Sequence, residues 1–566
     1  MHGALFIAEI LQHIFHCFSD EFYRIRGSSG NERTLSTLAR TCKTFKEPAL
    51  DALWENIASL DPFIKCLPYE AWKFIEATRL EWNGQTRHIP TFTSPLTAGD
   101  RLILRKYTPR VRRFHMTLLD RSYLDALFEL SLATSDSHHL FPNLKHLNWV
   151  AMPTEFRPYL RMFLPTTLES LSYIIGPLSG RKGDASMLAA IGTFCPDLKK
   201  ITVGFSNDVE GGTDAFSRSV LCWKRLTVLH CREMTDEALV HIARLPTLQG
   251  LSITLYSTAS FADTRSQVDG IPFGNVTTLK VIALNLKVFI AFTTEMALSL
   301  VDVELWITDN DCSESAKESF DEIAKGNRSL CNLRILSCRD QDVLIPPDYS
   351  HVIRGRTATI STFQPLFKFH QLRVLDVTFC CSMVLSDFDI MVLAYSFPLI
   401  EVLLLNANYG WESPSPITFV GILSVIRLCP KLQKLGIEFD ATATDPIITC
   451  PSPKTSQEST PVLIMPKATD LKAFYVGNSP IKDAFLVGRY LSILMPNLDR
   501  IYGWKPRHMR NDDPGWVRDR RRFMRRWANA ELVVRRLRSR DIANADPDDQ
   551  TLVELMAIVN TDVSEE

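Results

Sequence analysis

The sequence contains almost none of the local patterns by which metal sites and common catalytic sites are recognised. It has 13 cysteines among 566 residues, but no C-x-x-C pair that would indicate a zinc or redox site. It has no phosphate-binding G-x-x-x-x-G-K-[ST] loop, no H-E-x-x-H zinc motif and no G-x-S-x-G nucleophile turn. His138 and His139 are adjacent, and neighbouring positions rarely converge on one metal ion. We therefore expect no metal, no cofactor and no enzymatic activity.

Long apolar runs and a large net charge are missing as well. No stretch approaches the roughly 18 apolar residues that a membrane span needs. The net charge of -1 gives no support to a nucleic-acid or membrane-surface role. The first residues have no basic segment, and Glu9 interrupts their apolar stretch, so they do not resemble a signal peptide. We expect a cytoplasmic and/or nuclear protein without nucleic-acid or membrane partners.

The first 58 residues predict a module of three short helices. Over residues 5–18, apolar side chains recur at helical spacing, at positions 7, 10, 11, 14, 15 and 18. Ser29 and Glu32 have the spacing of a capping box, so a second helix is expected to start there. Pro48 suits the first turn of a third helix. Helices this short bury little apolar surface alone, so the module is either a docking unit or a plain helical cap.

The same residues resemble a known family. The strings L-F-I-A-E-I-L-x-x-I-F at 5–15, L-x-x-L-A-x-x-C-K-x-F at 35–45 and A-L-x-x-L-W at 49–54 look like an F-box. The segments at 60–68 and 95–111 extend the resemblance, over roughly the first 115 residues, to the F-box/leucine-rich-repeat proteins abundant in fungi. One departure is Ala8, where the family usually has a proline that pre-sets the backbone for the helix start.

The resemblance implies a partner and a role. F-box modules bind the Skp-type adaptor of a cullin-based ubiquitin ligase, so the chain would be a substrate receptor that directs clients to proteasomal degradation. Carried over to this sequence, the adaptor-binding residues would be Leu5, Phe6, Ile7, Ile10, Ile14 and Phe15, with Leu38, Lys43 and Trp54 contributing or supporting.

The long middle of the chain carries an irregular repeat of the form L-x-x-L-x-L, with other apolar residues tolerated. We count fourteen instances, starting at Val111, Leu144, Leu168, Leu198, Leu226, Leu248, Leu279, Leu300, Leu333, Leu372, Leu399, Leu432, Leu471 and Leu498. Proline stands two residues before six of these starts, where it would end a helix and turn the chain into a strand. Helical patterns fill segments between the starts, as in 235–245, 387–397 and 418–429.

A strand followed by a helix in each repeat predicts an α/β repeat protein, a leucine-rich-repeat solenoid or horseshoe, because a lone unit cannot cover its apolar face. An irregular α/β domain is the alternative. The expected organisation is an F-box-like helical module at 1–58, a connecting segment at 59–108, the solenoid at 109–505 with loop insertions near 339–362 and 443–468, and a basic capping helix with an acidic tail at 506–566.

Alternation along each strand predicts which side chains face the concave surface. If the leucines fill the core, the middle residue of each L-x-L faces outward. That gives His115, Asn148, Ser172, Thr202, His230, Ser252, Ala283, Glu304, Ser337, Asp376, Leu403, Gly436, Tyr475 and Tyr502. Aromatic anchors on a rigid wall suit protein recognition, so the candidate client-binding residues are Glu304, Asp376, Tyr475, Tyr502 and Trp504. The alternative is that the C-terminal segment covers these aromatics as a cap.

The C-terminal region is electrically divided. Residues 505–540 hold 13 Lys/Arg and 4 Asp/Glu, whereas residues 541–566 hold 8 Asp/Glu and no Lys/Arg. The basic part fits a terminal helix that caps the solenoid, or a nuclear-import or acidic-partner patch around Arg518 to Arg526.

Two functional hypotheses remain open at the level of the sequence. The first is a substrate receptor of a Skp-cullin-F-box (SCF) type ubiquitin ligase, which the intact apolar stripe from Ile7 to Phe18 favours. The second is a leucine-rich-repeat scaffold with a decayed F-box, which Ala8 favours.

Overall fold

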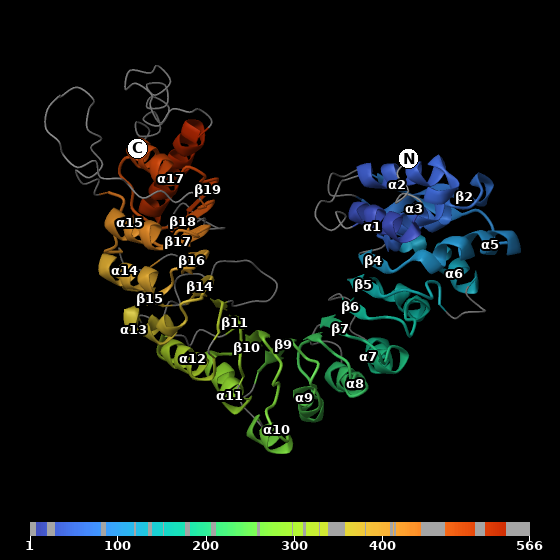
Figure 1. The fold of residues 1–566 in the computed structure, drawn as a ribbon, viewed down its shortest axis with the longest axis horizontal. Coiled ribbons are helices and arrows are strands. Elements are labelled where there is room, and N and C mark those ends of the chain that lie inside the picture. The colour runs from blue at the N-terminus through green and yellow to red at the C-terminus, as the bar shows by residue number, and fades with distance from the viewer. Residues whose placement is uncertain are drawn as a thin grey trace. The chain divides into compact units, whose positions relative to one another are not determined.

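The fold is that of a computed structural model, an α/β structure dominated by one long parallel sheet (Figure 1). The structure describes residues 7–19, 29–80, 86–117, 120–133, 139–150, 152–175, 182–204, 211–256, 261–296, 298–308, 313–327, 329–337, 357–379, 381–407, 411, 415–442, 470–503 and 515–538. The chain divides into two compact units, residues 1–253 with 266–275, and residues 254–265 with 276–566.

The N-terminal module consists of helices α1 (Ala8–Ser19), α2 (Ser29–Thr41) and α3 (Lys43–Glu55). Their shared core contains Leu11, Phe15, Leu35, Ala49 and Ala52. The start of the third helix differs from the sequence prediction, because α3 begins at Lys43 and Pro48 lies inside it. A single residue, Cys42, separates α2 from α3, and its backbone is extended. Because only one residue separates the two helices, α3 starts earlier than the sequence predicted, and Pro48 lies in its second turn.

The segment at 59–108, expected only to connect, is folded and packed. It contains α4 (Asp61–Lys65), the antiparallel strands β2 (Trp72–Leu80) and β3 (Thr86–Phe92), and α5 (Ala98–Tyr107). Trp54 of α3 stacks on Tyr107 with ring centroids 4.5 Å apart, and lies 5.2 Å from the ring of Phe63. These aromatic contacts fix α3 to the segment that leads into the solenoid.

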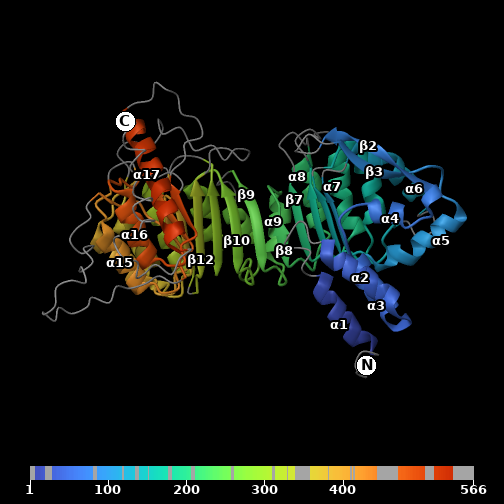
Figure 2. The same cartoon turned by 90° about the horizontal axis from the view of Figure 1, so that it is seen from above.

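The long sheet has 15 strands among the described residues, and the pairings within each unit are parallel. In unit 1 they are β1 (Asn56–Ile57), β4 (Arg113–Thr117), β5 (His146–Val150), β6 (Ser170–Ile174), β7 (Lys200–Gly204), β8 (Val228–His230) and β9 (Gly250–Leu255), the last of which ends in unit 2. In unit 2 they are β10 (Thr278–Ala283), β11 (Asp302–Ile307), β12 (Asn332–Ser337), β14 (Val374–Thr378), β16 (Val402–Leu405), β17 (Lys434–Gly436), β18 (Ala473–Gly477) and β19 (Arg500–Gly503). Figure 2 shows strands β10 to β12 side by side. Fourteen of the 15 strands fall on the fourteen predicted repeats, and β1 is the addition.

Helices or short helical turns link most of these strands, as the repeat predicts. The longer ones are α6 (Leu124–Ala133), α7 (Lys182–Phe194), α8 (Gly212–Val220), α9 (Asp236–Ala243), α10 (Phe261–Gln267), α11 (Leu286–Met296), α12 (Ser313–Gly326), α14 (Asp387–Ser396), α15 (Phe419–Leu428) and α16 (Ala484–Leu494). The three helices expected at 235–245, 387–397 and 418–429 are confirmed as α9, α14 and α15. Each has a side-chain N-cap, from Thr235, Ser386 and Thr418 respectively. The leucines of the repeats fill the core between strands and helices.

Three of the predicted repeat starts are wrong in register. The strands align Lys280, Glu304, Arg334, Asp376, Leu404, Gly436, Tyr475 and Tyr502 in one row. The sequence predicted that Ala283, Ser337 and Leu403 belong to this row. In the structure, Lys280, Arg334 and Leu404 stand in their places. Ala283 and Leu403 are in fact buried, 0% and 1% exposed. The true starts are Val276, Leu330 and Ile400, and the apolar residues that follow each of them fit the repeat in either alignment.

The C-terminal end is covered by α17 (Gly515–Arg538), which packs on α16 and β19. Trp527, Ala530, Val533 and Val534 of α17 are buried. A Cβ at Gly488 of α16 would lie 2.8 Å from the carbonyl oxygen of Ala530, so the two helices meet at a glycine. The part of the basic segment that the structure describes is therefore a helix packed on the last repeat.

Several predicted segments fall partly or wholly outside the described residues. These are Trp504, the acidic tail at 541–566, the insertion near 443–468, and most of the insertion near 339–362. At the end of the last, Thr357–Ala358 form β13 and Ile360–Phe363 form α13. Among the described helices, none is both long and apolar enough to cross a membrane.

Candidate protein-binding surfaces

Helix α1 presents a row of isoleucines to solvent. Ile7, Ile10 and Ile14 are 47%, 37% and 40% exposed, and their spacing of three and four residues places them on one face. The adjoining face carries Leu11 and Phe15, which are 1% and 3% exposed within the module core. The helix is therefore apolar on two sides, and only one of them is covered in this chain.

The other predicted adaptor residues lie in different environments. Lys43 is exposed at the first position of α3, and Leu38 is partly buried against the module core. Phe15 is buried in the module core, whereas Trp54 is buried against Phe63 and Tyr107 of the segment that follows the module. Leu5 and Phe6 lie outside the described residues. The structure thus brings Ile7, Ile10 and Ile14 together on one surface, while Phe15, Leu38 and Trp54 are buried or partly buried.

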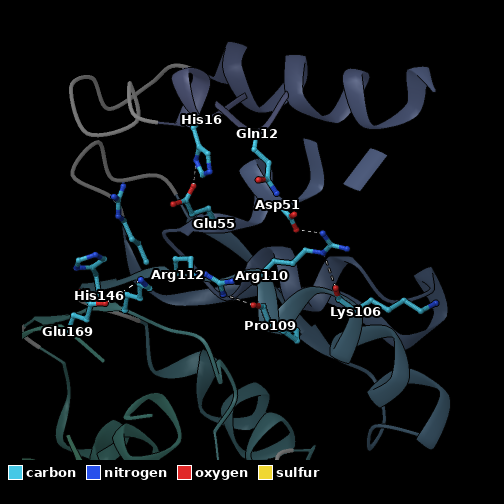
Figure 3. Close-up of a pocket in the computed structure, with 12 residues that line it drawn as sticks. Gln12, His16, Asp51, Glu55, Lys106, Pro109, Arg110, Arg112, His146 and Glu169 are labelled. Carbon is cyan, nitrogen blue, oxygen red and sulfur yellow. Dashed lines mark hydrogen bonds and ion pairs between the residues drawn. The ribbon is translucent and has the colours of Figure 1, made fainter. Parts of the chain in front are cut away.

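A polar cavity of about 630 Å³ lies beside this module, within unit 1 (Figure 3). It is lined from α1, α3, α5 and the beginnings of the first strands, by Gln12, His16, Asp51, Glu55, Lys106, Pro109, Arg110, Arg112, Arg113, Lys145, His146 and Glu169. Local sequence patterns give no signal for such a site, because its lining residues are spread over 158 positions (12 to 169). Only the stacking of the module on the first strands assembles it.

Ion pairs join the two sides of the cavity. His16 Nδ1 of α1 lies 2.7 Å from Glu55 Oε2 of α3. Arg110 pairs with Asp51 and with Glu47, both on α3. Figure 3 shows the side chain of Arg110 between Asp51 and the main-chain carbonyl of Lys106, to which its Nε donates at 3.1 Å. The contact of His16 therefore joins α1 to α3, and those of Arg110 tie α3 to the turn just before β4.

In unit 2, charged side chains alternate along the row that the strands align. Lys280 Nζ lies 2.7 Å from Glu304 Oε1 and 5.2 Å from the ring centre of Trp306, whose Nε1 donates to the same oxygen at 2.6 Å. Burial would raise the pKa of Glu304, but the hydrogen bonds from Lys280 and Trp306 outweigh it and the pKa is lowered. Glu304 therefore stays ionised on this face, with Arg334 and Asp376 as the next positions of the row.

Asp376 is the exceptional carboxyl group of the row. Burial raises its pKa from the usual 3.8 to about 6, although the positive charges of Arg334 and Lys434 act in the opposite direction. In the folded chain this carboxyl group binds its proton more tightly than in the unfolded chain. Its contribution to stability is therefore complete below pH 3.8 and is lost as the pH rises through about 6.

We expect the substitution Asp376→Asn to stabilise the protein at pH 7.5, on the order of 1 kcal/mol, because it removes a charge that is costly to bury. The advantage should shrink as the pH falls to 4.5, where the wild-type carboxyl group is largely protonated. Thermal unfolding of both proteins at the two pH values measures this, with the exposed Asp470→Asn as the matched control. A stability difference that is the same at both pH values would contradict the assignment.

The row ends in an aromatic pair. The rings of Tyr475 and Tyr502 stack with centroids 4.5 Å apart and an interplanar angle of 17°. Tyr502 is 40% exposed, so the described part of α17 does not cover it. Between Asp376 and this pair stand Leu404 and Gly436, and a Cβ at Gly436 would meet Leu404 Cδ2 at 2.7 Å. Along the row, charged side chains are therefore followed by Leu404 and Gly436, then by the partly buried Tyr475 and the exposed Tyr502.

The described residues offer no metal centre, since no three His, Cys, Asp or Glu side chains among them could hold an ion together. The arginines of α17 lie in two environments, and the nuclear-import or acidic-partner patch stays a prediction. Arg526 donates to the carbonyl oxygen of Ile481 at 3.0 Å, which ties the cap to the last repeats, while Arg522 and Arg525 are exposed.

Comparisons with known proteins add little to this geometry. No family model matches the chain, and no curated protein matches it. One solved structure that it resembles is entitled "Crystal structure of Rad7 and Elc1 complex in yeast", with 12% sequence identity over 89% of this chain and 91% of that one. The TM-score is 0.33, a level of likeness from which neither fold nor function is argued.

Proposed function

We propose that this chain is a non-catalytic substrate-recognition subunit of an SCF-type ubiquitin ligase, acting in the cytoplasm and/or nucleus. Helix α1 docks the Skp-type adaptor, and through it the cullin. The row of side chains along the sheet of unit 2 holds a client protein. Ubiquitin transfer is carried out by other subunits, and this chain contributes by bringing the client close.

The observation that carries the proposal is the exposed isoleucine row of α1. Three isoleucines on one face of a short helix are unusual on a protein that has no partner. An amphipathic helix that lays its apolar face into a groove is a common mode of protein recognition, and it uses this i, i+3, i+7 spacing. Burial of each side chain would contribute up to about 1.5–3 kcal/mol to binding.

The geometry at Ala8 supports adaptor docking rather than a decayed F-box. Helix α1 begins at Ala8, the position where the family usually has proline. Alanine has the highest helix propensity of all residues, so the helix starts there without the ring of a proline. Ala8 therefore no longer favours the scaffold alternative. That alternative differs from the main proposal only in predicting that the chain does not bind the adaptor.

The client side of the proposal is supported by the row from Glu304 to Tyr502. Its charges fix orientation and its tyrosines supply rigid aromatic area, which is the composition found at the centres of protein interfaces. Glu304, Asp376, Tyr475 and Tyr502 lie on one face because the strand register aligns them. Extended segments of a client could cross several strands on this face.

Co-purification of the intact chain with a Skp-type adaptor and a cullin tests the proposal. We expect stoichiometric recovery of the adaptor with the intact chain, and of the cullin only when the adaptor is present. Recovery of neither with a chain that is folded by circular dichroism would overturn the receptor role and leave the scaffold alternative.

A further inference from the structure

The cavity beside the N-terminal module borders an edge of the sheet that is rich in positive charge. Each of the strands β4 to β7 begins with a pair of residues at this edge, and the strand register brings the pairs next to one another. The pairs are Arg112–Arg113, Lys145–His146, Glu169–Ser170 and Lys199–Lys200. This cationic edge thus holds five Lys/Arg side chains and a single carboxylate, Glu169.

The carboxylates around the cavity already have side-chain partners. Glu169 accepts from Lys199 at 2.9 Å and lies 3.3 Å from Lys145, while Asp51 and Glu55 pair with Arg110 and His16. Arg112 has no carboxylate within 4 Å among the described residues, and its described hydrogen bond goes to the carbonyl oxygen of Pro109 at 2.7 Å. Figure 3 shows Arg112 and His146 below the cavity, and His16 and Gln12 above it. The charge of Arg112 on the lower wall is therefore not compensated by a carboxylate among the described residues.

The pKa values of two histidines are lowered by the same positive charges. Burial lowers the pKa of His146, and Arg113, Lys145 and Lys200 lower it further, against the opposing effect of Glu169. Burial and Arg113 also lower the pKa of His115, on the same strand as Arg113. Cations that suppress protonation of their neighbours would instead favour a bound anion.

We propose that this cavity binds a small molecule that carries two or more phosphate groups. Arginine and lysine side chains are the usual phosphate donors in proteins. The volume of about 630 Å³ lies in the range of small-molecule sites, and is too large for a single inorganic anion to fill. The cations stand on separate strands, so one phosphate group cannot reach them all, whereas linked phosphates can. This inference is independent of the proposed ligase function.

A ligand held here would contact both walls of the cavity. Gln12 and His16 come from α1, whereas Arg112, Lys145 and His146 come from the beginning of the solenoid. Binding should therefore stabilise the docking of the module on the first strands, and raise the melting temperature of the protein.

Titration calorimetry of the full chain with sodium tripolyphosphate tests the site, at constant ionic strength because screening alters any charge interaction. We expect 1:1 binding, at least about tenfold tighter than that of orthophosphate. Reversing two cations that line the cavity, Arg112→Glu with Lys145→Glu, should weaken tripolyphosphate binding by about tenfold or more, on the basis that a charge-assisted hydrogen bond accounts for about a factor of ten.

Two controls make the outcome decisive. The conservative pair Arg112→Lys with Lys145→Arg should bind within about threefold of the wild type, and the exposed pair Lys317→Glu with Lys431→Glu, which lies outside unit 1, should bind unchanged. Equal affinities for tripolyphosphate, orthophosphate and sulfate would overturn the proposal. So would binding that survives charge reversal at the edge, or tighter binding of an oligoglutamate peptide, which would identify an acidic protein segment as the ligand. Melting curves without ligand establish that each variant is folded.

Discussion

Replacing Trp527 by alanine is expected to lower the free energy of unfolding of the C-terminal repeats by about 3–5 kcal/mol, the usual cost of deleting a buried tryptophan side chain. Trp527 is 1% exposed, and its Nε1 donates to the carbonyl oxygen of Ser479 at 2.8 Å. Its ring lies 5.8 Å from that of Phe439, which belongs to the core of an earlier repeat. The substitution removes packing from two layers at once and leaves a buried carbonyl group without its donor.

The effect should be concentrated at the end of the solenoid, because a repeat protein is stabilised by interfaces between neighbours. Hydrogen exchange of α16, β18 and β19 measures it locally, where a single global unfolding energy would be poorly defined. The matched control is Arg525→Ala on the exposed side of the same helix, which should change stability by less than about 0.5 kcal/mol. Unchanged exchange in Trp527→Ala would show that α17 is not a structural cap.

The double substitution Ile10→Asp with Ile14→Asp is expected to weaken adaptor binding by 100-fold or more. Each isoleucine that loses its burial in a partner costs roughly 1.5 kcal/mol or more, and a factor of ten in affinity corresponds to about 1.4 kcal/mol. Desolvation of the two introduced carboxylates adds to the loss. Since both side chains are exposed in the free chain, the module itself should keep its fold.

Titration of a Skp-type adaptor into each purified chain measures this loss. The matched control is Ile271→Asp, an isoleucine of unit 1 that is 73% exposed and distant in sequence from α1. It should bind the adaptor as the wild type does. Phe15→Asp is unsuitable for this purpose, because Phe15 is 3% exposed and a buried carboxylate would unfold the module. Wild-type affinity in the double variant would remove α1 from the docking surface.

The repeat architecture was predictable from the sequence because each unit repeats the same requirement. An apolar residue at i, i+3 and i+5 recurs in nearly all of the fourteen units, and a proline that ends the preceding helix stands before six of them. The register was less secure where apolar residues are dense. From Ile400 to Leu405, five of the six residues are apolar, so two alignments fit and only the pairing of Leu404 with Asp376 and Gly436 decides.

The candidate surfaces also differ in how far the sequence predicts them. The isoleucine row of α1 follows from helical periodicity, although the pattern alone does not tell which side faces the core, and Phe15 shares the stripe while facing inward. The strand β1, the β2–β3 pair and the cationic cavity depend on contacts between segments far apart in the chain, such as Asn56 with Arg113. No local pattern records those contacts, so the sequence could not predict them.

Hydrogen exchange of the intact chain, alone and with a purified Skp-type adaptor, tests the central claim most directly. The account predicts that the adaptor slows exchange in α1 and at the start of α3, and leaves β10 to β19 of unit 2 unchanged and open to a client. Absence of protection in α1 at saturating adaptor, or protection confined to the solenoid strands, would contradict it.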